Sequence, residues 1–188
     1  MVKVDLYRQY KDEYVAPKKP AFVEIGSAQY LTIGGDGEPG GAEFVAAIGA
    51  LYNVAFTIKM ASKKAGRDYA IAKLECFWSN PKDWRLAIRT PDFIGASDLR
   101  ATIAALKAKR KPGEVAQVRL KKETEGRSVQ MLHLGPYPKI RGSVAKLAAF
   151  AEEHGARFHG ELHELYLSDP RRVAPERLRT ILRHPVTK

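Results

Sequence analysis

Residues 164–170 read Glu-Leu-Tyr-Leu-Ser-Asp-Pro, and residues 75–81 read Glu-Cys-Phe-Trp-Ser-Asn-Pro. In both stretches an acid is followed two positions later by an aromatic ring, and a Ser-Asn/Asp-Pro sequence typical of a turn ends an extended run. Internal similarity of this kind indicates a repeated structural unit. The sequence therefore predicts that the chain contains one unit twice.

The similarity extends to both sides of these stretches. Upstream, residues 30–36 align with residues 131–137, because each is an apolar alternating run that is stopped by glycine. A segment with helical periodicity follows each run. Downstream, residues 89–91 (Arg-Thr-Pro) align with residues 183–185 (Arg-His-Pro). Each copy is thus predicted to have the order strand, helix, strand, strand.

Two such units predict an α+β fold, in which duplicated β-α-β-β units form an antiparallel sheet with helices on one face and a ligand groove between the repeats. The length suits a single domain over residues 1–188. Its expected parts are an N-terminal extension (1–22), a first repeat (23–96), a connecting helix capped by Ser97 with a linker (97–126) and a second repeat (127–188).

The composition limits the classes of function. No uncharged apolar run reaches the length of about 18 residues that a membrane span needs, and the N-terminus lacks the apolar stretch of a signal peptide. The single Cys76 cannot form an intramolecular disulfide, so we expect a cytoplasmic protein. The net charge of +11 would attract phosphates, but the basic residues are scattered and come with no nucleic-acid-binding motif. Nucleic acid is therefore an unlikely partner.

Glu164 and Glu75 are the main candidates for a functional site. Strand alternation places Tyr166 beside Glu164, and Phe77 beside Glu75 with Tyr69 further along the same face. If the halves meet about a pseudo-twofold axis, both acids and both rings converge on one cavity. Trp78 and Tyr137 are further candidates for its wall. A half-buried acid among rings suits a cationic or planar aromatic ligand, or general acid/base chemistry.

A structural role is the alternative for each of these residues. Both glutamates could pair with basic neighbours at a sheet surface, as Lys73 could with Glu75, and Trp78 and Tyr137 could fill the core.

Other motifs carry less weight. Residues 35–40 fit the pattern G-x-G-x-x-G, but two acids lie within it and no alternating parallel β-α units follow, so we expect a turn and no nucleotide cofactor. His159, Glu161 and His163 alternate along one strand and could provide two metal ligands, yet nothing completes a site. We interpret them as solvent-facing residues and expect no metal. His133 is interpreted as a hydrogen-bonded sheet histidine.

Three sets of residues resemble the GyrI-like small-molecule-binding proteins, over nearly the whole chain. They are Leu74–Trp78, Glu125-Gly126 with His133–Tyr137, and His163–Pro170 continuing through Leu182–Val186. The resemblance implies a duplicated strand-helix-strand-strand fold with a ligand groove between the repeats and an acid in it that matches Glu164. Related domains are the effector-binding parts of drug-responsive transcription activators.

The resemblance also implies two functions. The first is a small-molecule-binding protein that accepts hydrophobic, aromatic or cationic compounds. The alternative is a hydrolase, similar to stand-alone members that open the cyclopropane of DNA-alkylating toxins by adding water. In that chemistry Glu164 or Glu75 would orient or deprotonate the water, and the hydroxyl of Tyr166 or Tyr137 would polarise a conjugated carbonyl.

Overall fold

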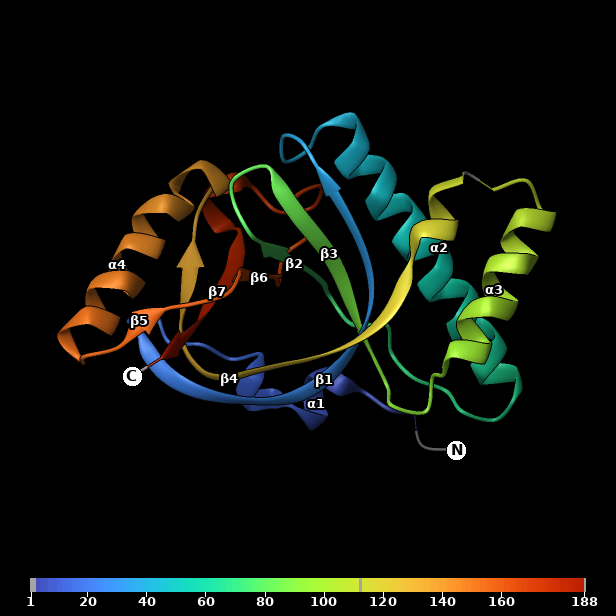
Figure 1. Ribbon diagram of the computed structural model, residues 1–188, viewed down its shortest axis with the longest axis horizontal. Helices are drawn as coiled ribbons and strands as arrows, with labels where there is room; N and C mark the ends of the chain where they lie inside the picture. The colour runs from blue at the N-terminus through green and yellow to red at the C-terminus, as the bar shows by residue number, and fades with distance from the viewer. Residues whose placement is uncertain (1–2, 112, 188) are drawn as a thin grey trace. The chain divides into compact units, whose positions relative to one another are not determined.

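The computed structural model describes residues 3–111 and 113–187, and it confirms the duplicated α+β organisation (Figure 1). In the first copy the elements are β1 (Ala21–Asp36), α2 (Ala42–Lys64), β2 (Leu74–Trp78) and β3 (Asp83–Thr90). In the second copy they are β4 (Arg119–Leu134), α4 (Ile140–Glu153), β6 (Leu162–Tyr166) and β7 (Arg179–Thr187). Each copy therefore has the predicted order.

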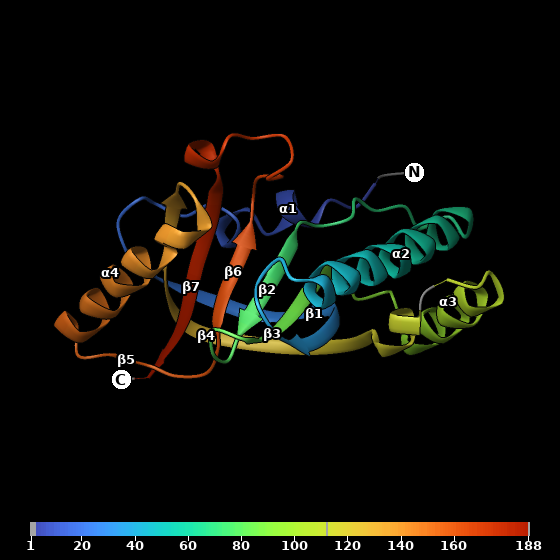
Figure 2. The same cartoon turned by 90° about the horizontal axis from the view of Figure 1, so that it is seen from above.

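The remaining elements are short or lie between the copies. They are α1 (Leu6–Gln9), η1 (Lys11–Glu13), α3 (Ala96–Ala108), η2 (Gly113–Gln117), η3 (Tyr137–Lys139), β5 (Arg157–Phe158) and η4 (Pro175–Arg177). The strands form a seven-stranded sheet in the order β4-β1-β3-β2-β6-β7-β5, and β4 additionally pairs with β7 (Figure 2). The pairings of β1 with β3, β2 with β6, β6 with β7, and β4 with β7 are antiparallel, as predicted.

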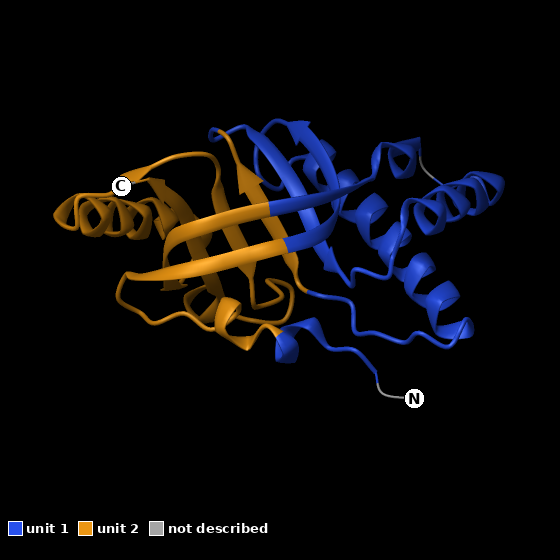
Figure 3. Cartoon of the chain, turned by 60° about the horizontal axis from the view of Figure 1, so that its bottom comes forward, with its two compact units in different colours: residues 1–9, 28–72, 80–123 blue, residues 10–27, 73–79, 124–188 orange. Residues whose placement is uncertain are grey.

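The chain divides into two compact units, which Figure 3 colours separately. Unit 1 consists of residues 1–9, 28–72 and 80–123, and unit 2 of residues 10–27, 73–79 and 124–188. These units differ from the two sequence repeats. Strand β2 belongs to the first repeat by sequence, but it lies in unit 2 with β6 and β7. Glu75 and Glu164 are consequently parts of the same unit.

In unit 1, α2 supplies much of the apolar interior. Its buried residues are Ala47, Ala50, Leu51, Val54, Ala55, Ile58 and Ser62. By length and composition alone, with 23 residues and a mean hydropathy of 1.5, α2 could also cross a membrane. The core helices of soluble proteins have the same properties, so this is weak evidence for a span. Helix α3 begins at Ala96, and the Asp98 carboxylate accepts a hydrogen bond from the N–H of Gly95 at 2.7 Å. The predicted cap at Ser97 is wrong, because Ser97 lies within the first turn.

In unit 2, α4 covers one face of the sheet. Buried apolar residues of α4 (Ile140, Leu147, Ala151) form a core with residues of β4 and β7 (Val129, Met131, Leu182, Val186) and with Ala156. The N-terminal segment packs on other apolar residues of the unit: Tyr14, Leu165 and Ile181 form a second buried cluster, against which Tyr10 and Ala16 pack. The backbone N–H of Leu132 donates to the carbonyl of Pro17 at 2.7 Å. The part of the extension from Tyr10 onwards therefore belongs to unit 2, whereas residues 1–9 are grouped with unit 1.

Candidate functional site

Strands β2 and β6 pair in a register that decides which side chains share a face of the sheet. Cys76 lies opposite Glu164, and Glu75 lies opposite Leu165. Opposed residues of an antiparallel pair project from the same face, and successive residues alternate between faces. Glu75 and Glu164 therefore project from opposite faces. The prediction that the two carboxylates converge is wrong.

The error is a shift of one residue in the alignment of the repeats. The burial profile of residues 74–78 is the same as that of residues 162–166. This match makes Cys76 the structural counterpart of Glu164, and Glu75 the counterpart of His163. Because side chains alternate with a period of two, a shift of one residue moves every side chain to the other face.

Glu164 lies on the face that α4 covers. Leu182 of β7 is opposite Glu164 in the pairing of β6 with β7, and Leu182 belongs to the apolar core with Leu147 and Ala151 of α4. We call this side of the unit 2 sheet the Glu164 face. Since Cys76 shares it, the nearest cross-strand neighbours of Glu164 are a thiol and an aliphatic side chain.

The Glu164 side chain is only 7% exposed. Its carboxylate accepts a hydrogen bond from the Tyr166 hydroxyl, with an Oη–Oε2 distance of 2.8 Å. Burial raises the pKa of Glu164 above its ordinary value, although hydrogen bonds from Tyr166 and Trp78 and the charge of His163 act in the opposite direction. No ion pair to Glu164 is found within residues 3–111 and 113–187. The carboxyl group is thus buried without a cation in contact with it.

Aromatic rings lie around this carboxyl group. The rings of Tyr137 and Tyr166 meet edge to face, with centroids 5.7 Å apart and an interplanar angle of 76°. Trp78 and Tyr166 are half-buried, and Tyr137 is 37% exposed. Burial and the neighbouring Glu164 both raise the pKa of the Tyr137 and Tyr166 hydroxyls. Both phenols are therefore neutral donors near neutral pH.

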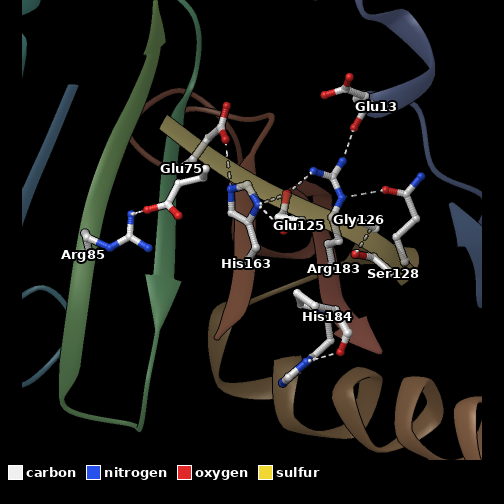
Figure 4. A network of polar contacts seen from close by, with 12 residues as sticks. Glu13, Glu75, Arg85, Glu125, Gly126, Ser128, His163, Arg183 and His184 are labelled. Atoms are coloured by element: carbon white, nitrogen blue, oxygen red, sulfur yellow. Dashed lines mark hydrogen bonds and ion pairs between the residues drawn. The ribbon is translucent and has the colours of Figure 1, made fainter. Parts of the chain in front are cut away.

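The opposite face holds a cluster of buried charges, shown in Figure 4. His163 contacts Glu75 through Nε2 at 2.9 Å and Glu125 through Nδ1 at 3.0 Å. Arg183 donates from Nη1 to Glu125 at 3.0 Å. The His163 ring also stacks on Phe77, with centroids 3.9 Å apart. We call Glu75, Glu125, His163 and Arg183 the buried charge cluster.

The geometry of the cluster fixes the charge of His163. Both ring nitrogens lie within hydrogen-bond distance of carboxyl oxygens, an arrangement that the imidazolium form satisfies by donating from both. Burial lowers the pKa of His163, but Glu125 and Glu75 together raise it above its ordinary value. Burial likewise raises the pKa of Glu125, but His163 and Arg183 outweigh it and hold the value at about 2. Two carboxylates then balance two cations in a site that is closed to water.

The N-terminal segment closes the cluster. The Tyr14 hydroxyl donates to Glu75 Oε1 at 2.9 Å, and Arg183 donates from Nη2 to the backbone carbonyl of Glu13. Arg183 also donates from Nε to the side chain of Gln130 at 3.2 Å. Glu75 is 0% exposed and its two oxygens bond to Tyr14 and His163, so its carboxylate is paired within the fold.

The structure separates the other predicted site residues. Phe77 is buried beside His163, away from the Glu164 face. Tyr69 precedes β2, is 1% exposed and packs edge to face on Phe93 within unit 1. Glu164, Tyr166, Trp78 and Tyr137 remain together in unit 2. The predicted groove between the repeats stays a prediction.

Several residues of unit 2 differ from their predicted exposure or pairing. His163 is fully buried, so its interpretation as a solvent-facing residue is wrong, whereas His159 is exposed as expected. Lys73 is exposed, and the cationic partner of Glu75 is His163. The tyrosines of the extension, Tyr10 and Tyr14, were the sequence signal that this segment packs on a buried surface. Among the described residues, no group of three or more His, Cys, Asp or Glu side chains could hold a metal ion.

Comparisons with solved structures agree with this fold. The chain is similar to a conserved, uncharacterized protein from Listeria innocua (32% identity, TM-score 0.92). The alignment covers 98% of this chain and 100% of the other. It is also similar to a protein from Listeria innocua described as a hydrolase (33% identity, TM-score 0.90), with the same coverage. The C-terminal domain of EcmrR shares the fold at 14% identity and a TM-score of 0.62, with 90% and 98% of the two chains covered.

No curated protein matches the chain. A family model, that of the GyrI-like small molecule binding domain, matches residues 19–187. This match includes every element of both copies and all residues of the Glu164 face. The chain therefore belongs to the GyrI-like small-molecule-binding domain family.

Proposed function

We propose that unit 2 binds hydrophobic, aromatic or cationic small molecules on the Glu164 face. The observation that carries the proposal is a carboxyl group that is 7% exposed and surrounded by rings, with no cationic partner among the described residues. Removing a carboxylate from water is costly unless a charge or hydrogen bonds compensate. A ligand cation would supply the missing charge, and an uncharged ligand would bind to the protonated form.

The rings fit the same class of ligand. Trp78, Tyr137 and Tyr166 combine apolar faces with polar edges, and such rings attract both planar aromatic groups and organic cations. Since Tyr137 is 37% exposed and Trp78 is half-buried, a ligand can reach them from the surface. The ligand class proposed from the sequence is thus supported on the Glu164 face, without Glu75, Phe77 or Tyr69.

A hydrolase is the second candidate function. Two proteins described as hydrolases are 32–33% identical to this chain over 98–99% of its length. Glu164 accepts a hydrogen bond from Tyr166, and the Tyr137 ring packs on Tyr166, so a base and a second phenol lie at one place. The substrate proposed is a cyclopropane conjugated to a carbonyl group, as in DNA-alkylating toxins.

The reaction would be the addition of water across one ring bond. Glu164, as the carboxylate, would take a proton from a water molecule while the oxygen of that water molecule forms a bond to a ring carbon. The breaking carbon–carbon bond would pass its electron pair to the conjugated carbonyl. The Tyr137 hydroxyl would donate a hydrogen bond to that carbonyl oxygen, because Tyr166 already donates its proton to Glu164. Proton return to the product completes the addition and restores Glu164.

Titration with a cationic rhodamine dye tests the binding proposal. We expect saturable binding that weakens about tenfold in Glu164→Gln, since a charge-assisted contact contributes about 1.5–3 kcal/mol. The exposed Glu153→Gln on α4 is the matched control and should bind as the wild type does. Equal affinity in all three proteins contradicts the proposal.

Mass spectrometry tests the hydrolase. The wild-type protein is incubated with a cyclopropane-bearing alkylating toxin, and we expect a product heavier by one water. Glu164→Gln should form it at least 100-fold more slowly, in line with the loss of a general base. A substrate that stays intact, or equal rates in Glu164→Gln and Glu153→Gln, removes the hydrolase and leaves binding alone.

We also propose that the protein works in the cytoplasm, because its single cysteine, Cys76, is buried and cannot form an intramolecular disulfide. Its basic charge leaves nucleic acid as a competing partner. Retention on DNA that falls steeply with salt would favour that partner, and weak retention at every salt concentration would exclude it.

A further inference from the structure

The Thr180 hydroxyl is a buried polar group of unit 2 that neither the fold nor the proposed function explains. Thr180 lies on β7 and is 1% exposed, and no hydrogen-bond partner for its Oγ1 is found in the described part of the chain. Leaving a buried hydroxyl unpaired is unfavourable, and nearly all such groups in folded proteins have a partner. An unpaired hydroxyl beside a binding site therefore calls for a role in binding.

Strand pairing places Thr180 within the Glu164 face. It lies opposite Tyr166 of β6 and opposite His133 of β4. Directly opposed side chains have Cβ atoms about 4.5–5.5 Å apart, and diagonal neighbours are about 7–8 Å apart. Glu164 is such a diagonal neighbour, because the residue opposite it on β7 is Leu182. Tyr166, Thr180 and His133 thus form a polar row next to Glu164.

The neighbours of Thr180 in this row already have partners. The Tyr166 hydroxyl donates to Glu164. His133 contacts the Ser143 hydroxyl through Nδ1 at 2.8 Å and the Pro136 carbonyl through Nε2 at 3.4 Å. Neither side chain forms a hydrogen bond with Thr180. Its hydroxyl is the unused donor of the row.

We propose that the Thr180 hydroxyl donates a hydrogen bond to a carbonyl oxygen of the ligand, about 7–8 Å from the Glu164 anchor. A carbonyl fits better than a donor group, because an unpaired O–H is the less tolerated half of a buried hydroxyl. The ligand is therefore an aromatic or polycyclic compound with a ketone or amide set apart from its cationic or apolar end.

Access to Thr180 requires a movement at the surface of the site. Among the rings of the Glu164 face, Tyr137 is the exposed one, and it belongs to a helical turn of three residues. Its displacement leaves the hydrogen bond between Tyr166 and Glu164 intact. Rotation of Tyr166 would break that bond.

This inference rests on the proposed function and deepens it. If the protein only binds ligands, Thr180 selects those with a carbonyl. If it opens a cyclopropane, Thr180 is aimed at the carbonyl oxygen that gains negative charge as the ring bond breaks, where a fixed donor accelerates the reaction. In both cases Thr180 touches the ligand directly.

Fluorenone and fluorene provide the test, because they differ mainly by one carbonyl group. We measure their dissociation constants with the wild type, Thr180→Val and Thr180→Ser. The expected result is that Thr180→Val binds fluorenone about tenfold more weakly and binds fluorene unchanged, since one hydrogen bond contributes about 1.4 kcal/mol. Thr180→Ser keeps the hydroxyl and should retain most of the affinity for fluorenone.

Thermal unfolding without ligand is the second readout. Because valine replaces an unpaired hydroxyl by a methyl group of the same shape, Thr180→Val should have an unchanged or higher Tm. An equal loss of affinity for both compounds, no loss for either, or a lower Tm overturns the role of Thr180. Loss of both affinities with a normal Tm counts against the inference as well.

The rhodamine titration separates this failure from that of the proposed function. If rhodamine binding depends on Glu164 but fluorenone binding is indifferent to Thr180, only the inference about Thr180 is wrong. If neither rhodamine nor fluorenone binds to the wild type, the site itself is wrong and both proposals fall.

Discussion

Cys76 lies across the sheet from Glu164, while Glu75 lies across from Leu165. This register gives the two glutamates of unit 2 different environments. Glu75 is fully buried between Tyr14 and His163, and Glu164 is surrounded by rings without a cation in contact. Glu75 is therefore paired within the fold, and Glu164 is the acid that we propose for ligand binding.

Substitution of the two acids should change stability by different amounts. Glu75→Gln leaves His163 with one carboxylate fewer in a site closed to water, and we expect the free energy of unfolding to fall by about 3 kcal/mol. Glu164→Gln should change it by no more than about 1 kcal/mol, because burial already disfavours the charged form. Urea denaturation at pH 7 measures both, with Glu153→Gln as the exposed control. Equal losses would contradict the assignment.

Glu164 should also make stability fall as the pH rises. Its pKa is higher in the folded state than the ordinary value of 4.5, so between these two values the native state binds more protons than the unfolded state. Stability from this group is present below pH 4.5 and is lost as the pH rises through the folded pKa. In Glu164→Gln that decline should be absent, as measured by urea denaturation across the pH range. An identical slope in both proteins would show that Glu164 is not held in an environment that disfavours its charge.

Glu125 should have the opposite pH dependence. Its pKa falls from 4.5 in the unfolded chain to about 2 in the folded protein. Its contribution is therefore complete above pH 4.5 and is lost as the pH falls towards 2, and it is worth about 3 kcal/mol at 1.36 kcal/mol per pKa unit. Acid titration of unfolding should show a steep loss in this range that is absent in Glu125→Gln. The variant should already be less stable at pH 7.

Tyr14→Phe should loosen the N-terminal segment without disturbing the Glu164 face. The substitution removes one hydrogen bond to Glu75, and we expect a loss of about 1 kcal/mol in stability. Hydrogen exchange of residues 10–17 should become faster, since the bond from Tyr14 to Glu75 is one of those that hold this segment on unit 2. Tyr10→Phe, in the same segment, is the comparison variant. Unchanged exchange in Tyr14→Phe would show that the hydrogen bond does not hold the segment in place.

The two tryptophans should report ligand binding differently. Trp78 is half-buried on the Glu164 face, and Trp84 is 2% exposed on β3 of unit 1, where it packs on Phe44. We expect a bound dye to quench Trp78, so that Trp78→Phe loses most of the quenching and Trp84→Phe keeps it. Quenching that persists in Trp78→Phe would place the ligand elsewhere in the protein.

The sequence by itself determined the order of the elements and the α+β class. Internal repetition and strand alternation are local properties, and they identified both copies. They also predicted a site that included Glu164, Tyr166, Trp78 and Tyr137, which lie together in unit 2, but also Glu75, Phe77 and Tyr69, which do not lie on the Glu164 face. The register between β2 and β6 is not local. Glu75 of β2 and His163 of β6 are 88 residues apart in the chain. Two such strands can pair in more than one register with similar patterns of buried residues, and only packing of the whole sheet selects one register.

Only the tertiary structure decided which charged side chains pair with one another. The sequence could not show that residues 10–17 cover the face that carries Glu75 and His163, because nothing in a local pattern specifies which surface an extension will bury. Once covered, charged groups must pair with each other, since water no longer solvates them. That requirement joined Glu75 to His163, Glu125 and Arg183, and it left Glu164, on the other face, as the acid without a cation in contact among the described residues.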